Sequence, residues 1–89
     1  METGKVIRLL RKNRGMSQVE LSSSSELDRS HLSSMESGKR DVGMFSLEKV
    51  ADALNLKAHH ILFLTQFKEK NIEEALEKLQ SLEKDLKKS

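Results

Sequence analysis

The sequence predicts an all-α fold of five short helices followed by an additional amphipathic helix. The chain of 89 residues contains no Pro and is rich in Leu, Lys and Glu, which are good helix formers. Helix start and stop residues divide it into short segments. Apolar residues recur within these segments every three or four positions, which is the spacing of one face of a helix.

The first two helices are expected over residues 4–14 and 17–24. The apolar face of the first is formed by Val6, Ile7 and Leu10. Gly15 follows it as a left-handed stop. The second helix opens with "SQVE", which matches a capping box. In that motif the Ser17 hydroxyl accepts a hydrogen bond from the amide three residues on, and the Glu20 side chain accepts one from the Ser17 amide.

A serine-rich stretch, "SSSSELDRSHLSSMESG", has the composition of a linker but the spacing of a helix. Asp28 is a suitable N-cap for a helix over residues 29–37, and Gly38 ends it. At 100° per residue, Leu32 and Met35 fall about 60° apart and define a buried side. The opposite side carries Ser30, Ser33, Ser34 and Ser37. The serines are therefore predicted to form the outer face of a folded helix.

Two further helices complete the predicted domain of residues 1–67. Ser46 is expected to cap a helix over residues 47–54, and Asn55 to follow its end. Its apolar stripe is formed by Leu47, Val50, Ala51 and Leu54. A fifth helix is expected to begin near Ala58 and to carry "HHILFLTQF".

The remaining residues, 68–89, are predicted to form a separate extension whose helix covers residues 71–87. Ile72, Leu79 and Leu86 repeat every seven residues, with Ala75 and Leu82 between them. The pattern is a little over two heptads, which is short for a coiled coil. Three roles remain open for this helix: extending a dimer, folding back on the domain, or binding a protein partner.

Composition and motifs exclude several classes of function. The chain has no Cys, so it has neither a disulfide nor a thiolate metal site. His59 and His60 are adjacent and lack the i, i+4 spacing of helical metal ligands, and no catalytic motif is present. We therefore expect no enzyme activity, cofactor, metal or small-molecule ligand. With no long apolar run and no signal peptide, the protein is expected to be cytoplasmic and to have no membrane partner.

The net charge of +2 is too small to indicate a nucleic-acid-binding protein by itself. The two helices at residues 17–24 and 29–37, joined by a short turn, are more informative, since they describe a helix-turn-helix. Residues 4–64 resemble the xenobiotic-response-element, or lambda-repressor-like, transcriptional regulators. The segments that carry the resemblance are "IRLLRKNRGMSQVEL", "LDRSHLSSMESGKR" and "SLEKVADALNLKAHHIL". It implies a five-helix lambda-repressor-like DNA-binding domain that binds double-stranded DNA.

The resemblance assigns roles to individual residues. Base contact in the major groove is implied for Arg29, Ser30, Ser33 and Ser34, with His31 on the flank of the same helix. Phosphate contact is implied for Ser17, Gln18, Ser37, Lys39 and Arg40. Arg29 suits guanine, because a guanidinium can bond O6 and N7 together. Arg11 and Glu36 match a pair that ties the first helix to the recognition helix. Each surface residue also has a simpler interpretation as an ordinary solvated side chain.

Three positions depart from the family pattern, and all of them concern turns or close crossings. Glu26 stands where the family has Gly, Ser22 where it has Ala, and Val42 where it has Pro. A positive φ at Glu26 would cost on the order of 1 kcal/mol.

The expected function is a sequence-specific transcriptional regulator, of repressor or controller type, that binds an inverted repeat as a homodimer. A dimer would span two major grooves one helical turn apart. Its interface is expected on the fifth helix, at Ile61, Phe63, Leu64 and Phe67. The alternative is a protein-interaction module, or an antitoxin-type regulator, whose helix at residues 71–87 binds a partner protein.

Overall fold

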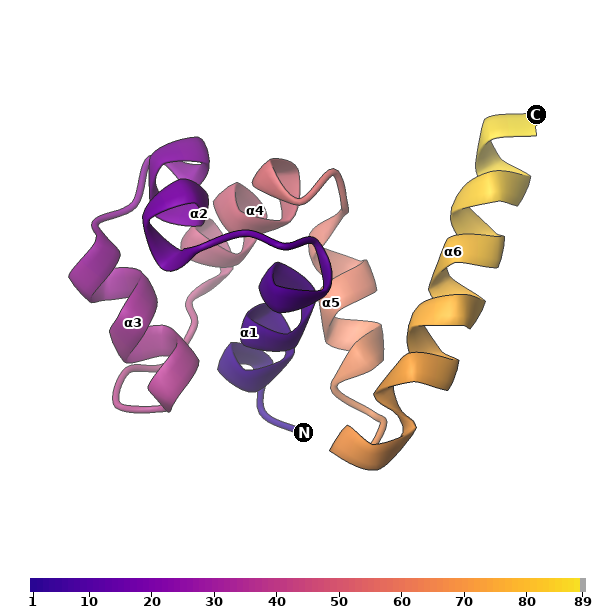
Figure 1. The fold of residues 1–89 in the computed structure, drawn as a ribbon, viewed down its shortest axis with the longest axis horizontal. Helices are drawn as coiled ribbons and strands as arrows, with labels where there is room; N and C mark the ends of the chain where they lie inside the picture. The colour runs from indigo at the N-terminus through magenta and orange to yellow at the C-terminus, as the bar shows by residue number, and fades with distance from the viewer. Residues whose placement is uncertain (89) are drawn as a thin grey trace.

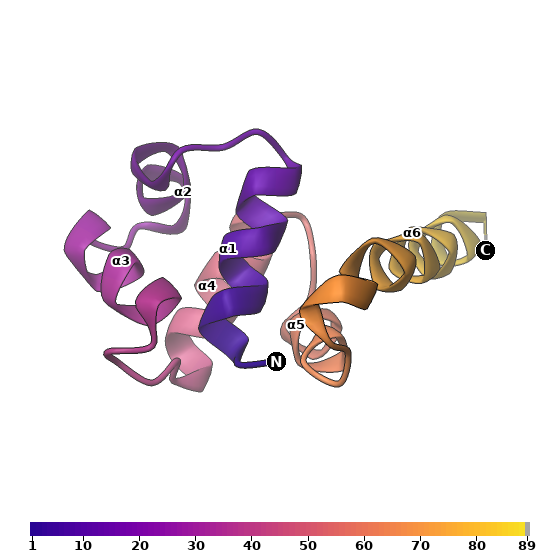
Figure 2. The same ribbon diagram turned by 60° about the horizontal axis from the view of Figure 1, so that its bottom comes forward.

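Figure 1 shows the computed structural model, which describes the backbone of residues 1–88 and the side chains of residues 1–81. Among residues 1–88 the secondary structure is entirely helical, as the sequence predicts. The elements are α1 (Thr3–Asn13), α2 (Gln18–Ser25), α3 (Arg29–Ser37), α4 (Met44–Ala53), α5 (Ala58–Leu64), the 3-10 turn η1 (Glu69–Asn71) and α6 (Ile72–Lys88). In Figure 1 and Figure 2, α2 and α3 lie at one end of the molecule and α6 at the other.

A single apolar core joins all six α-helices. α1 packs against α3 and α5, while α2 packs against α3 and α4. The largest fully buried side chains are Val6, Ile7, Leu10, Leu21, Leu32, Met35, Leu47, Val50, Leu54, Ile61 and Leu64. These include the predicted apolar faces of the first and third helices and that of the fourth apart from its small residue Ala51, which is also buried. Burial of this continuous set holds the recognition-helix candidate, α3, on a rigid support.

The predicted ends of the helices largely agree with the backbone. Gly15, Gly38 and Asn55 all have positive φ, as left-handed stops require. The capping box is confirmed: the Ser17 hydroxyl accepts from the Glu20 amide at 3.0 Å, and the Glu20 carboxylate accepts from the Ser17 amide at 3.1 Å.

One predicted cap is wrong. Asp28 is the N-cap residue of α3, as predicted, with extended backbone and a carbonyl that accepts from the Leu32 amide at 2.9 Å, although its side chain makes no capping hydrogen bond. Ser46 does not start α4, because the helix already begins at Met44 and Ser46 is buried within it. Gly43 has the extended backbone of an N-cap, and its carbonyl accepts from the Leu47 amide at 2.9 Å. A cap needs this backbone geometry more than a particular side chain, so the helix starts earlier.

The C-terminal helix folds back on the domain over its first turns. Ile72, Ala75, Leu76 and Leu79 are buried and join the core, and α6 packs against α5. In Figure 2 the rest of α6 extends away from the domain. The predicted heptad positions Leu82 and Leu86 lie outside the residues whose side chains are described. Three roles were predicted for this helix. Over its described residues, the packing corresponds to one of them, folding back on the domain.

Glu26→Gly is expected to raise the free energy of unfolding by up to about 1 kcal/mol. Glu26 has φ 59° and ψ 30°, where the Cβ of an L residue is crowded. Glycine relieves the crowding, although its greater freedom in the unfolded chain offsets part of the gain. The lost side chain is 84% exposed and makes only a 4.0 Å ion pair with Lys49, which contributes little.

The matched control is Glu26→Ala, which removes the same side chain but keeps the Cβ. Thermal unfolding should show a midpoint higher by no more than roughly 4–8 °C in the glycine variant, and no increase in the alanine variant. Equal midpoints for the two variants would show that the turn is not strained.

Candidate nucleic-acid interface

The helix-turn-helix is formed by α2, a tight turn and α3. The Leu27 amide donates to the Ser22 carbonyl at 3.1 Å, which closes the end of α2, and Glu26 reverses the chain in the left-handed conformation. Ser22 is buried at the crossing and its hydroxyl donates to the Val19 carbonyl at 2.9 Å. A serine therefore fits where the family has Ala, because its polar group is satisfied within its own helix.

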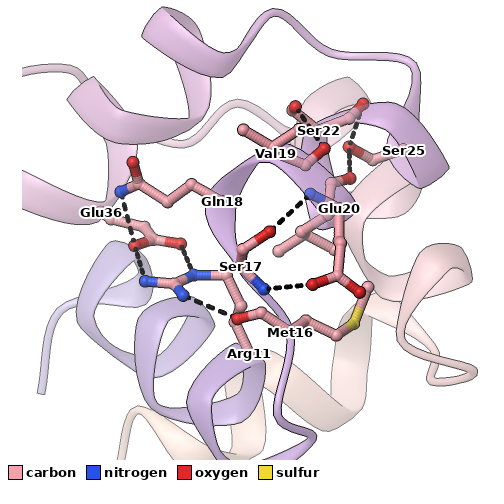
Figure 3. A network of polar contacts seen from close by, with 10 residues as sticks. Arg11, Met16, Ser17, Gln18, Val19, Glu20, Ser22, Ser25 and Glu36 are labelled. Carbon is pink, nitrogen blue, oxygen red and sulfur yellow. Dashed lines mark hydrogen bonds and ion pairs between the residues drawn. The ribbon is translucent and has the colours of Figure 1, made fainter.

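A buried ion pair fixes α3 to α1. The Arg11 guanidinium donates to both carboxylate oxygens of Glu36, from Nε to Oε2 at 2.8 Å and from Nη2 to Oε1 at 2.9 Å. The side chains are only 9% and 3% exposed. Figure 3 shows the two side chains facing each other across the two helices. The hydrogen bonds that Arg11 donates to the Glu36 carboxylate raise the pKa of Arg11 above its ordinary value, and partial burial opposes that rise.

The same pair also holds the start of α2. Arg11 Nη1 donates to the Met16 carbonyl at 2.9 Å, and Gln18 Nε2 donates to Glu36 Oε1 at 3.2 Å, as Figure 3 shows. Gln18 is therefore oriented by the pair, and one of its two amide hydrogens is used inside the protein. The other hydrogen is still available to an external acceptor. One polar network thus sets the positions of α1, the first turn of α2, and α3.

Gly4 is a second point at which α1 and α3 are held together. A Cβ added at Gly4 would lie 1.8 Å from the Met35 carbonyl oxygen and 2.8 Å from its carbon. Only glycine allows the backbones to approach so closely. The spacing of apolar residues does not predict this contact, although a Gly in the first turn of a helix is the kind of residue that signals a close approach.

The residues predicted to contact bases all lie on α3. Its inner face, Leu32 and Met35, is fully buried. Arg29, Ser30 and Ser33 are exposed, and His31 and Ser34 are half-buried. Arg29 makes no ion pair or side-chain hydrogen bond with any residue in the described part of the chain. The helix thus presents one unpaired guanidinium and several short polar side chains on the face away from the core.

The residues predicted to contact phosphate lie at both flanks of α3. Ser17 and Gln18 start α2, and Lys39 and Arg40 are exposed in the loop between α3 and α4. Ser37 is exposed, but its hydroxyl already donates to the Ser34 carbonyl at 3.2 Å. These residues combine two cations with the N-terminus of α2, whose dipole favours anions.

The predicted dimer interface needs correction. Ile61 and Leu64 are fully buried, because α5 packs against α1, α4 and α6. They therefore form part of the domain core and lie at no surface. Phe63 and Phe67 are half-buried and meet edge to face, with ring centroids 5.3 Å apart. On α5 the large apolar side chain with substantial exposure is Leu62, at 39%.

Among the described residues, none of the helices combines the length and the apolar character that a membrane span requires. Within the same residues, no group of three or more His, Cys, Asp and Glu side chains has the geometry to hold a metal ion.

Comparison with known proteins agrees with this geometry. The helix-turn-helix family matches residues 7–61. A hypothetical transcription factor of Neisseria meningitidis serogroup B is 37% identical over 60 residues, which are 67% of this chain and 57% of that protein. The immunity repressor of Bacillus phage phi105 is 28% identical across the whole chain, which covers 67% of the repressor. The chain thus spans between half and two thirds of these relatives.

A solved structure shows the same fold. The restriction-modification controller protein C.AhdI from Aeromonas hydrophila is 36% identical, with a TM-score of 0.64 over 66% of this chain and 89% of that one. The chain therefore belongs to the XRE, or lambda-repressor-like, helix-turn-helix family of transcription regulators.

Proposed function

We propose that this protein is a transcriptional repressor or controller that binds an inverted-repeat operator as a homodimer and acts by binding rather than by catalysis. The observation that carries the proposal is the state of α3. Its inner face is locked by the core and by the Arg11–Glu36 pair, while its outer face is exposed. A rigid helix with a free polar face is what major-groove recognition requires.

The predicted DNA-contacting side chains fall into two groups: those that position α3 on the DNA backbone and those that contact the bases. Ser17, Gln18, Lys39 and Arg40 flank α3 and would place it along the phosphate backbone, without reading sequence. Arg29 would read a guanine, since it is the long side chain left unpaired on the recognition face. The serines are short, so they would act through close approach, bridging water, or DNA shape.

The partner-protein alternative receives less support. The apolar stripe of α6 that such a partner would use is buried on the chain itself from Ile72 to Leu79. A partner would have to displace this packing or use the residues beyond it.

The decisive experiment is selection of bound sequences from a random duplex pool, followed by titration at several salt concentrations. We expect an enriched inverted repeat and an affinity that falls steeply with salt, because cations and helix N-termini contact phosphates. Recovery of no motif, with only weak salt-sensitive binding, would refute sequence-specific recognition.

Arg29→Ala and Lys39→Ala should weaken DNA binding in different ways. Arg29→Ala should weaken the free energy of operator binding by about 1–3 kcal/mol and relax the preference at one base pair, because a bidentate guanine contact is lost. Loss of Lys39 should weaken all sequences alike and reduce the salt slope by about one. Titrations against the selected operator and its single-base variants distinguish the two. A Lys39 variant with altered base preference would contradict the assignment.

A further inference from the structure

The first turn of α1 contacts both the proposed recognition helix and the C-terminal segment. On one side, Gly4 lies so close to α3 that a Cβ there would come within 1.8 Å of the Met35 carbonyl oxygen. On the other side, Lys5 Nζ forms an ion pair with Glu69 Oε2 of η1 at 2.7 Å. Figure 2 shows α1 between α3 and α5. Neighbouring residues of one helical turn therefore connect α3 to the turn from which α6 starts.

A second polar contact joins the chain entering α1 to the end of α5. The Met1 nitrogen donates to the Thr65 carbonyl at 2.7 Å. An open hollow of about 510 Å³ lies between these segments, and it is lined by Met1, Glu2, Lys5, Lys68 and Glu69. Since the segments are not closely packed around this hollow, the two polar contacts hold them together.

The C-terminal helix is held on the domain by a short apolar stripe. The buried members of the stripe are Ile72, Ala75, Leu76 and Leu79, each no more than 9% exposed. They come from residues 72–79 of a helix of 17 residues, and the residues between them are exposed. A segment with so few buried apolar contacts opens at a lower cost than the core does.

We propose that α6 is a clamp: its docking onto the domain holds α3 in the DNA-binding position, and its release weakens DNA binding. Docked α6 fixes η1, and η1 with the end of α5 holds the start of α1. The Gly4 contact with α3 is made by backbone and leaves no free space, so α3 must follow a movement of this turn. The inference rests on the proposed function, because it takes α3 as the helix that enters the groove.

Coupling of this kind acts in both directions. If docked α6 strengthens DNA binding at α3, DNA bound at α3 must strengthen the docking of α6 by the same factor. In Figure 1 the two helices lie at opposite ends of the molecule. DNA bound along α3 therefore affects α6 through the domain between them, and a charge placed on α6 lies away from the DNA.

Two substitutions in the full chain test the clamp. Ala75→Glu and Leu79→Glu each place a carboxylate in the buried stripe, and the cost of an unpaired buried charge favours release of α6. Each variant should bind a duplex with one selected half-site about fivefold or more weakly than the wild type does. A single half-site is used so that the affinity does not depend on dimer formation.

Gln80→Glu is the matched control. It adds the same charge to the same helix, next to Leu79 in sequence but on the exposed face. Its affinity for the half-site should stay within about twofold of the wild type, because an exposed charge far from the DNA is screened by salt. Equal affinities of Gln80→Glu and Leu79→Glu would overturn the clamp.

A general loss of stability must be separated from release of α6. Titrations are made at roughly 20 °C below the unfolding midpoint of each variant, where nearly all of the chain is folded. Leu54→Ala shortens a fully buried side chain at the end of α4, and under this condition it should bind the half-site as the wild type does. A comparable loss in Leu54→Ala would contradict a specific role of α6. Leu76→Ala weakens the stripe without adding a charge, and replaces the glutamate variants if they do not fold.

Hydrogen exchange measures the coupling from the other side. Binding of the half-site duplex to the wild type should slow exchange of the backbone amides of residues 72–79 by about fivefold or more. Unchanged exchange there would overturn the clamp. Failure of the proposed function is a separate result, since it appears as the absence of a selected half-site for the wild type. The free chains then decide: amides of α3 should exchange faster in Leu79→Glu than in Gln80→Glu, and equal rates would refute the coupling.

Discussion

Replacing Gly4 by Ala is expected to destabilise the protein by about 2–3 kcal/mol or more. In an unobstructed helix the change would be favourable by up to about 1 kcal/mol, because alanine is the better helix former. Here the added methyl would lie 1.8 Å from the Met35 carbonyl oxygen, which is backbone and cannot rotate away. α1 and α3 must therefore move apart, and the packing of Met35 and its neighbours is lost.

The same change made elsewhere provides the control. A Cβ at Gly43 meets no atom within 4 Å, and φ there is −70°, so Gly43→Ala should alter stability by no more than about 1 kcal/mol. Urea unfolding followed by circular dichroism gives both free energies. Since α3 is the proposed recognition helix, Gly4→Ala should also weaken binding to the proposed operator under conditions where it remains folded. Equal stability of the two variants would contradict the close approach.

The second large effect is expected from breaking the buried Arg11–Glu36 ion pair. Glu36→Leu should lower the free energy of unfolding by about 3–5 kcal/mol. The substitution leaves the Arg11 guanidinium buried without its carboxylate, and Gln18 loses the acceptor that orients it. Arg11→Met should cost a similar amount for the converse reason. The Arg11→Met, Glu36→Leu double variant should cost clearly less than the sum, because no charge is then left unpaired.

An exposed ion pair serves as the comparison. Lys5 and Glu69 approach as closely, at 2.7 Å, but both side chains are about half exposed. The hydrogen bond from Lys5 lowers the pKa of Glu69, so any stability this pair adds is present at neutral pH and is lost as pH falls through the lowered pKa. Lys5→Met should change stability far less than either core variant. For the buried pair, the opposite result would be additivity. If the losses in free energy of unfolding of Arg11→Met and Glu36→Leu simply add in the double variant, the two side chains act independently.

Local chemistry was the most predictable part of this protein. The ends of α1, α3 and α4 follow from Gly15, Gly38 and Asn55, because a left-handed stop is a property of one or two residues. The capping box at Ser17 and Glu20 is likewise contained in four residues. The resemblance to the family supplied the Arg11–Glu36 pair, which lies 25 residues apart in sequence and which periodicity alone would not connect.

The sequence-based predictions that were wrong concern residues whose role depends on which other helix packs against them. Ile61, Leu62 and Leu64 are all apolar and neighbouring, and the sequence treats them alike. The structure buries Ile61 and Leu64, because α5 packs against α1, α4 and α6, and leaves Leu62 39% exposed. Ser46 looked like a cap and is instead inside a helix that starts at Met44.

By itself, then, the sequence determined the helical class, the places where most helices stop, and the family, since these depend on single residues and short spacings. Tertiary structure decided the approach of α1 to α3 at Gly4, the return of α6 onto the domain, and which apolar residues remain outside. The physical reason is that periodicity shows that a helix has an apolar face, whereas burial depends on which other helix covers that face.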